Sequence, residues 1–449
     1  MTSWPQLRRR RTVRAGRATG RVLRCGLMDT MLADLAVSVV LYFERPLDDD
    51  RLAAGLARAL ERVPVFAGRL RTEGDVLSAV CDDTGVPLDV YTVEGTLAEA
   101  MGRATATGAD LVDPVDAPAA RLGGAPLLTV RVTRTADGGT VLGCSWHHAI
   151  GDLHSFVLLL RIWSAAVEGE PLAEAELVDD QDALLDRVVP APDCGRPGFR
   201  IPAAAEAELL AREVAAAPRA NRVVQVHFGE AEVRRMRAEF GAAAGRRLSA
   251  GDVLCAHLLS TLRELDGDRA ERMLTVPVNA RRWLGLSPAL VGNLLSEVHL
   301  PHRPEDGPAA LAGALRAAVE DFPAAHLNLR ANLDFLAAVG RSRLGACVPL
   351  GFDPAARRFS FSNWSRFGVY RLSFQGRRPV FFSPAANYPL PWVGWTVEGF
   401  GGSGFLSTVV LPARLAARVR GADGRAALHR FRAADDELPA LAAAVPRVI

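Results

Sequence analysis

Hydrophobic and polar positions along the chain switch between two periods, and the switches predict a mixed α/β protein. Residues 36–43 form an apolar run rich in valine that ends before Pro46, which predicts a strand. Apolar residues between Leu52 and Val63 then recur at helical spacing soon after Asp48, which predicts a helix with an aspartate cap. Strand and helix therefore alternate from the start of the chain.

The next segment predicts a hairpin that leads into a long apolar helix. Residues 126–133 and 139–146 are strand candidates, joined by a turn at 136–138. The helix is expected to begin after Asp152, because the apolar residues that follow, Phe156 among them, continue at helical spacing.

The second half of the chain repeats this alternation after a change in composition. Between 168 and 219, acidic residues, prolines and a helix-prone Ala/Glu/Leu stretch replace the strand pattern, which indicates a crossover. Beyond it, the pattern predicts a strand over 223–228, a helix over 249–265 and a buried strand over 273–278. Several short strands are expected between 358 and 412, separated by glycine and proline.

Chain length supports a division into two units. The 449 residues exceed one ordinary core, so two domains of roughly 200 residues each are expected. We predict an N-terminal half over 1–190, a crossover linker over 191–219 and a C-terminal half over 220–449.

Composition and charge narrow the functional classes. Hydrophobic residues make up 49% of the chain and charged residues 23%, the balance of a folded protein. A net charge of +2 demands neither nucleic acid nor an anionic membrane as partner. The arginine run 8–11 is interpreted as a solvated flap, with a nucleic-acid or phosphate role as the weaker alternative. All of the positive charge is arginine, which excludes lysine Schiff-base chemistry and a P-loop lysine.

Cysteine usage and hydropathy indicate a protein of the cytoplasm. No apolar run reaches the ~18 residues of a membrane span, and no apolar stretch follows the N-terminal arginines as in a secretory signal. We expect a cytoplasmic monomer. No Cys-x-x-Cys pair occurs, which favours reduced thiols over a disulfide framework or a metal site; the cysteines are Cys25, Cys81, Cys144, Cys194, Cys255 and Cys347.

The candidate chemistry lies in residues 145–152, which read Ser-Trp-His-His-Ala-Ile-Gly-Asp. The predicted strand ends at Trp146 and the next helix follows Asp152, so His147 and His148 lie on a connection, where rigid scaffolds present reactive groups. Histidine has an ordinary pKa near neutrality, as a base at pH 7 requires. The octapeptide alone is equally consistent with two ordinary loop histidines and a capping aspartate.

Segments spread over most of the chain resemble the BAHD acyltransferases. They resemble, more distantly, the condensation domains of nonribosomal peptide synthesis, and both groups are relatives of chloramphenicol acetyltransferase. The matching segments follow the order of the family. They are Leu-Met-Asp at 27–29, Phe-Ala-Gly-Arg-Leu at 66–70, Pro-Leu-Leu at 126–128 with the double histidine, Val-Asn-Ala-Arg at 278–281, Gly-Asn at 292–293 and Ser-Asn-Trp-Ser-Arg-Phe at 362–367.

The resemblance implies an α/β fold of two chloramphenicol-acetyltransferase-like mixed-sheet domains, joined by a long crossover with a solvent tunnel between them. His148 would be the general base that deprotonates the acceptor. Asp152 would form a structural ion pair with Arg281 instead of orienting the base. Ser362 and Trp364 would stabilise the oxyanion, which suits a hydroxyl and an indole N–H. The residues expected to support these groups are His147, Gly151, Arg281 and Asn293.

The same resemblance implies the substrates. An acyl-CoA thioester, or the phosphopantetheine arm of an acyl carrier protein, would be the co-substrate, and a hydroxyl or amine of a small specialised metabolite would be the acceptor. No covalent acyl-enzyme, no permanently bound cofactor, no metal and no nucleic-acid or membrane partner are expected.

One segment departs from the family. Where the family has Asp-Phe-Gly-Trp-Gly-Lys-Pro, residues 373–379 read Ser-Phe-Gln-Gly-Arg-Arg-Pro, so only Phe374 and Pro379 are retained. In the family this motif lies away from the base and helps shape the coenzyme A side. The departure therefore bears on the choice of thioester more than on the chemistry.

Three functions are consistent with these observations. Acyl-CoA-dependent transfer is favoured. A carrier-protein-dependent, condensation-like enzyme that forms esters or amides is the alternative, and consumption of one thioester or the other separates the two. A non-catalytic scaffold or a relative with cyclisation chemistry is the third, against which the retained His148 argues, because a scaffold needs no base.

Overall fold

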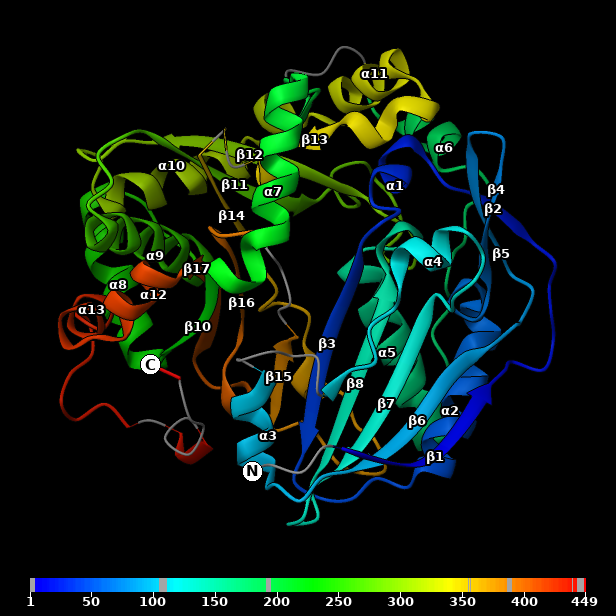
Figure 1. Cartoon of the computed structure of the whole chain (residues 1–449). Helices are drawn as coiled ribbons and strands as arrows, with labels where there is room; N and C mark the ends of the chain where they lie inside the picture. Colours follow the sequence, from blue (N-terminus) through cyan, green and yellow to red (C-terminus); the bar gives the residue numbers. More distant parts are fainter. Residues whose placement is uncertain are drawn as a thin grey trace.

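Two six-stranded mixed sheets organise the fold (Figure 1). The computed structural model describes residues 5–104, 111–190, 195–353, 355, 357–385, 390–437, 439–441 and 448–449. The first sheet has the order β1-β6-β7-β8-β3-β15 and the second β10-β17-β16-β14-β11-β12. Each contains both parallel and antiparallel pairs, as predicted for two mixed-sheet units.

The strands of the first sheet are β1 Gln6–Val13, β3 Ala36–Phe43, β6 Val86–Thr92, β7 Leu128–Arg134, β8 Thr140–His147 and β15 Phe381–Pro384. Those of the second are β10 Asn221–Phe228, β11 Arg272–Asn279, β12 Leu295–His302, β14 Arg358–Asn363, β16 Val393–Glu398 and β17 Phe405–Pro412. The smaller sheets contain β2 Val22–Arg24, β4 Arg69–Glu73 and β5 Val76–Val80, and β9 Phe199–Arg200 with β13 Val348–Pro349.

The α-helices are α1 Leu27–Met31, α2 Asp49–Arg62, α3 Leu97–Ala104, α4 Ala117–Arg121, α5 Leu153–Glu168, α6 Gln181–Val188, α7 Ala204–Ala220, α8 Glu230–Ala244, α9 Ala250–Asp266, α10 Pro308–Glu320, α11 Leu329–Val339, α12 Ala413–Arg420 and α13 Ala422–Leu428. Helices α2 and α5 pack on each other against the first sheet, and α8, α9 and α10 pack together against the second (Figure 1).

Local sequence accounts for the ends of the main helices. Asp48 caps α2 by accepting from the amides of Asp50 and Arg51, and Ser249 caps α9 by accepting from that of Asp252. The predicted strands at 36–43, 126–133, 139–146, 223–228 and 273–278, and the helices at 51–63, after 152 and at 249–265, are confirmed to within about two residues.

One strand crosses from the second half of the chain to the first sheet. β15 pairs antiparallel with β3, Phe381 lying opposite Tyr42. The predicted domain limits stay a prediction. Residues 191–194 of the expected linker lie outside the described residues, and the rest of that segment contains β9 and the 17-residue helix α7.

The arginine run 8–11 is largely exposed, as expected for a solvated segment, but it is not a flap. Residues 8–11 lie within β1, which pairs with β6 along the edge of the first sheet. Arg9 and Arg11 form ion pairs with both Asp49 and Asp50. Arg10 pairs with Asp89 of the neighbouring strand. Charged side chains are one way in which proteins protect an edge strand from further pairing.

Within the described part of the chain, no helix is long and apolar enough to cross a membrane. The described cysteines, Cys25, Cys81, Cys144, Cys255 and Cys347, are buried and free, and Cys194 lies outside the described residues.

Candidate active site

The double histidine lies on a tight connection between β8 and α5. His147 ends the strand, residues 148–150 form a short 3₁₀ turn, and Asp152 caps the helix by accepting from the Ser155 amide. The indole of Trp146 donates to the Gly151 carbonyl at 2.9 Å. A Cβ on Gly151 would lie 2.7 Å from that of Ser155, so only glycine fits where the connection meets the helix.

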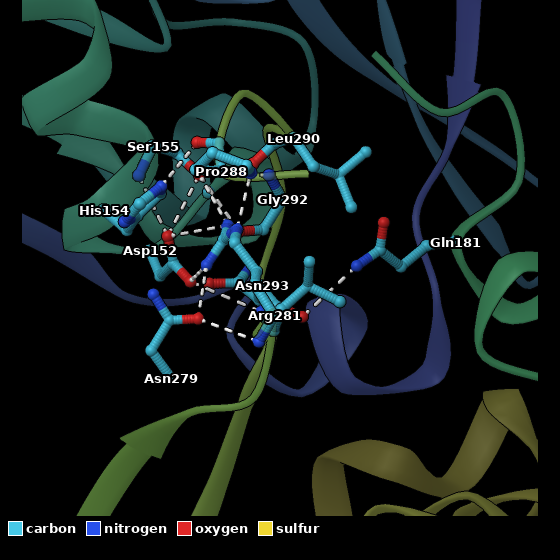
Figure 2. Close-up of polar contacts among 12 residues, drawn as sticks. Asp152, His154, Ser155, Gln181, Asn279, Arg281, Pro288, Leu290, Gly292 and Asn293 are labelled. Atoms are coloured by element: carbon cyan, nitrogen blue, oxygen red, sulfur yellow. Dashed lines mark hydrogen bonds and ion pairs between the residues drawn. The ribbon is translucent and has the colours of Figure 1, made fainter. Parts of the chain in front are cut away.

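Asp152 points toward Arg281, which follows β11 in the second half of the chain (Figure 2). Nη1 of the guanidinium donates to Oδ2 at 2.7 Å and Nη2 to Oδ1 at 3.1 Å, and each side chain is only 3% exposed. The carboxylate also accepts from the amide and hydroxyl of Ser155, both at 3.0 Å, and from the Leu294 amide at 3.3 Å. The pair is therefore buried and hydrogen-bonded on several sides.

Further hydrogen bonds fix the guanidinium of Arg281 in place. Nε donates to the carbonyl of Leu290 at 3.0 Å, Nη2 to that of Gly292 at 2.8 Å and Nη1 to Oδ1 of Asn279 at 3.2 Å. Burial by itself raises the pKa of Asp152, but the charge and hydrogen bonds of Arg281 outweigh it and hold that pKa below its usual value. The ion pair is thus fully charged at neutral pH and joins the two halves.

The two histidines occupy different environments. His147 is fully buried; its Nδ1 accepts from the Ala149 amide at 3.2 Å, and Nε2 faces the Ala117 carbonyl at 3.4 Å. Burial lowers the pKa of His147 to about 4, so this ring is neutral with both nitrogens engaged. The contacts of His147 therefore hold the end of β8 in place.

Asn293 sets the tautomer of His148. Its amide nitrogen donates to the His148 carbonyl at 2.8 Å and to Oδ1 of Asp29 at 2.9 Å, which fixes the orientation of the amide. Oδ1 of Asn293 therefore faces Nδ1 of His148, at 3.1 Å, and can only accept. Nδ1 must carry the proton, and Nε2 of the neutral ring carries the lone pair. Nε2 has no hydrogen-bond partner among the described residues.

Burial also decides the charge of these groups. It lowers the pKa of His148, against smaller opposing effects of the residue's own backbone, Asp152 and Asn293, so the ring is neutral at pH 7. Burial raises the pKa of Asp29 to about 6, although the Asn293 amide and the Gly26 amide oppose it. Asp29 thus supports Asn293 from a site where its own charge is costly.

His148 lines a cavity of about 420 Å³ formed by both halves of the chain. Ser362, at the end of β14, and Trp364 line the same cavity, as do Asn293 and Glu297. The ring of Trp364 packs against that of Trp395 at 6.2 Å, and its backbone amide donates to Thr396. The four residues predicted to be catalytic therefore all line this cavity: His148, Asp152, Ser362 and Trp364.

A second cavity, of about 600 Å³, lies at the N-terminus of α9. Asn363 lines both cavities, so the two adjoin there. Arg247 and Arg366 line the second cavity; both are exposed, and neither forms an ion pair within the described ranges. Arg316, also in its wall, is held by Asp252. The cavity therefore presents two uncommitted guanidinium groups.

The departing segment 373–379 lies far from the histidines. Phe374 is fully buried and packs edge-on against Trp163, with ring centroids 5.4 Å apart. Ser373 bonds to Ser164 and Glu168 in the last turns of α5, about 24 Å along the helix from Asp152 at its start. No residue of the segment lines either cavity.

Three contributors escaped the sequence analysis: Ser155 in the ion-pair network, Asp29 behind Asn293, and Glu297 in the cavity. Asp29 had a signal, since it falls in the 27–29 segment that resembles the family. Ser155 and Glu297 had none. Among the described residues, no group of histidine, cysteine, aspartate and glutamate is placed to hold a metal.

The family model described as the transferase family matches residues 9–389. The chain belongs to this family, the BAHD acyltransferases, and is an acyltransferase. Agmatine coumaroyltransferase-1 from Hordeum vulgare is 26% identical over 397 residues, which cover 82% of this chain and 85% of that enzyme. Rosmarinate synthase from Plectranthus scutellarioides is 26% identical over 265 residues, and the match spans 58% of this chain and 61% of that enzyme.

Solved structures confirm the fold. TRI101 of F. graminearum, complexed with ethyl coenzyme A, superposes with a TM-score of 0.72 at 15% identity, over 90% of this chain and 98% of that one. The first condensation domain of the CDA synthetase superposes with a TM-score of 0.55 at 15% identity, over 95% and 97%. The two-sheet architecture is therefore the one that the family resemblance implies.

Proposed function

We propose that this acyltransferase moves an acyl group from acyl-CoA to a hydroxyl or amine of a specialised-metabolite acceptor, with His148 as general base. The observation that carries the proposal is the state of the His148 ring. The ring lines the cavity, and its Nδ1 is engaged by Asn293. Its Nε2, which holds the lone pair, has no hydrogen-bond partner in the part of the chain that the structure describes.

The reaction follows from the groups around the cavity. Nε2 of His148 takes the proton of the acceptor as its oxygen or nitrogen attacks the thioester carbonyl. Ser362 and Trp364 donate hydrogen bonds to the oxyanion. When the tetrahedral intermediate collapses, the carbon–sulfur bond breaks, and the departing thiolate takes the proton from the protonated ring of His148. The base contributes about 100- to 10,000-fold to the rate. No covalent acyl-enzyme forms.

The second cavity supports coenzyme A as the donor. Arg247 and Arg366 have no ion-pair partner in the described part of the chain. Their guanidinium groups can therefore bind the phosphates of a nucleotide. Asn363 connects this wall to the catalytic cavity, so a pantetheine chain can run from one to the other. TRI101, whose structure is similar, is complexed with ethyl coenzyme A.

The donor is tested with three thioesters of one acyl group: acyl-CoA, acyl-pantetheine and acyl-carrier protein. Release of thiol is followed with wild type and with the double variant Arg247→Ala/Arg366→Ala. We expect the double variant to raise KM for acyl-CoA at least tenfold and to leave KM for acyl-pantetheine unchanged. Consumption of the carrier-protein thioester alone would establish the condensation-like alternative.

The base is tested with His148→Ala, and with His326→Ala as a matched control that lines neither cavity. We expect His148→Ala to lower kcat by at least 100-fold at an unchanged melting temperature and His326→Ala to retain full activity. Unchanged turnover in His148→Ala would refute general-base catalysis and favour a non-catalytic or cyclising role. The expected cytoplasmic location and monomeric state stay predictions.

A further inference from the structure

The catalytic cavity contains one carboxylate that the proposed reaction does not use. Two carboxylates, Asp152 and Glu297, are among the residues that line the cavity, and Asp152 is neutralised by Arg281. Glu297 forms no ion pair with an arginine among the described residues. Its side chain forms no hydrogen bond with the residues that the structure describes. The walls of the cavity are mostly apolar, and Leu295 and Phe352 are among the residues that line them.

Glu297 lies on the wall that also carries Asn293. On β12, Leu295 and Glu297 share one face of the strand, and both line the cavity. Pro277 of β11 lies opposite Glu297 and lines it too. Glu297 is four positions after Asn293, so its backbone lies at most about 13 Å along the chain from the residue that holds His148.

Two glycines leave room for this carboxylate. A Cβ on Gly198 would lie 3.0 Å from Oε2 of Glu297, and one on Gly351 would lie 3.3 Å from Oε1. The two come from separate segments, and the Gly198 carbonyl accepts from the Leu350 amide. The side chain of Glu297 is nevertheless 22% exposed. Since the residue lines the cavity, this exposure is available to a ligand.

The protein supplies little to balance the charge of Glu297. Nε2 of His299 lies 3.4 Å from Oε2 and has no hydrogen-bond partner of its own. Arg358 donates to Nδ1 of the same ring at 3.3 Å, so the proton of His299 is on Nε2, facing Glu297. Burial lowers the pKa of His299 to about 4, which keeps this ring neutral.

Burial raises the pKa of Glu297 to about 7, and the charge of Arg358 offsets only part of that effect. A carboxyl group in this state is only partly ionised at neutral pH. A positive charge in the cavity would favour the ionised form, so ligand and carboxylate would stabilise each other.

We propose that Glu297 binds a cationic nitrogen, an ammonium or guanidinium group, of the acceptor, and so selects acceptors with a second, basic nitrogen remote from the acylated atom. The inference rests on the proposed function, whose acceptor it specifies. The alternative is that a neutral amide or hydroxyl group of the acceptor forms a hydrogen bond with His299 or Glu297. In that case an acceptor without a positive charge would bind equally well.

The test compares 1,5-diaminopentane with pentylamine at a fixed thioester concentration, in wild type, Glu297→Gln and Glu305→Gln. Both acceptors present the same nucleophile, and only the first carries a remote cation. Glu305 is exposed and lines neither cavity, so Glu305→Gln controls for the loss of a charge. The readout is the ratio of kcat/KM for the diamine to that for the monoamine.

We expect wild type and Glu305→Gln to prefer the diamine and Glu297→Gln to lose about 10- to 100-fold of that preference, as for one charged hydrogen bond. An equal ratio in wild type and Glu297→Gln would overturn the inference while leaving acyl transfer intact. If no thioester is consumed, calorimetric binding of the diamine decides instead. Binding to wild type and not to Glu297→Gln supports the cation site although acyl transfer has failed, and equal binding to both overturns it.

Discussion

Replacement of Asp152 by alanine tests whether this aspartate acts through structure or through the base. The substitution removes the carboxylate partner of Arg281 and leaves the guanidinium buried, at 3% exposure of its side chain. Removing one member of a buried ion pair costs about 3–5 kcal/mol, because the remaining charge is uncompensated. Arg281 keeps its bonds to the carbonyls of Leu290 and Gly292. We therefore expect about 3 kcal/mol, the lower end of the range.

The assay is urea unfolding of wild type, Asp152→Ala, Arg281→Ala and the double variant, with thioester turnover measured on each. The double variant leaves no uncompensated charge, so its cost should be smaller than the sum of the single costs by about 1–3 kcal/mol. The pKa of Asp152 is lowered in the folded protein, so its contribution is present above its unfolded pKa of about 3.9 and is lost as the pH falls below that value. Additive costs, or an Asp152→Ala variant as stable as wild type, would refute the structural ion pair.

Three further outcomes follow from the site. Burial lowers the pKa of His148, and only the unprotonated ring can act as a base, so kcat/KM should fall as the pH decreases. The midpoint of this acidic limb should lie below about pH 6.5. A midpoint above pH 7 in the pH–rate profile would contradict this prediction. Asn293→Ala releases Nδ1 and should lower kcat about 10- to 100-fold with less effect on acceptor KM, measured by steady-state kinetics; a change in KM alone would argue against control of the tautomer. Ser362→Ala should lower kcat by no more than about 1,000-fold, and no change at all would remove its hydroxyl from the oxyanion site.

The resemblance and the structure agree closely at the ion pair and less closely elsewhere. The family resemblance implies an ion pair between Asp152 and Arg281, and the structure has a bidentate contact between these two side chains. The segment 373–379 was expected to bear on coenzyme A, yet it packs on the far end of α5. Its changed residues are therefore compatible with an intact catalytic cavity and an intact arginine-lined one.

Short-range patterns determined the elements of this protein. The valine-rich run at 36–43 and the caps at Asp48, Asp152 and Ser249 act through neighbours within a few residues, and each is found where the pattern placed it. The position of the histidines at a strand end follows from the same local rules.

Tertiary structure alone decided the surroundings and the charge of these groups. The amide that sets the tautomer of His148 comes from Asn293, 145 residues away, and the second carboxylate of the cavity comes from β12. The arginines of β1 lie in an edge strand that pairs with β6, beside acidic residues of α2 and β6. Burial then set the charges: it made His147 inert, lowered the pKa of His148 and raised that of Glu297. Such effects depend on how the two halves of the chain pack around one cavity, and no spacing along the sequence encodes that packing.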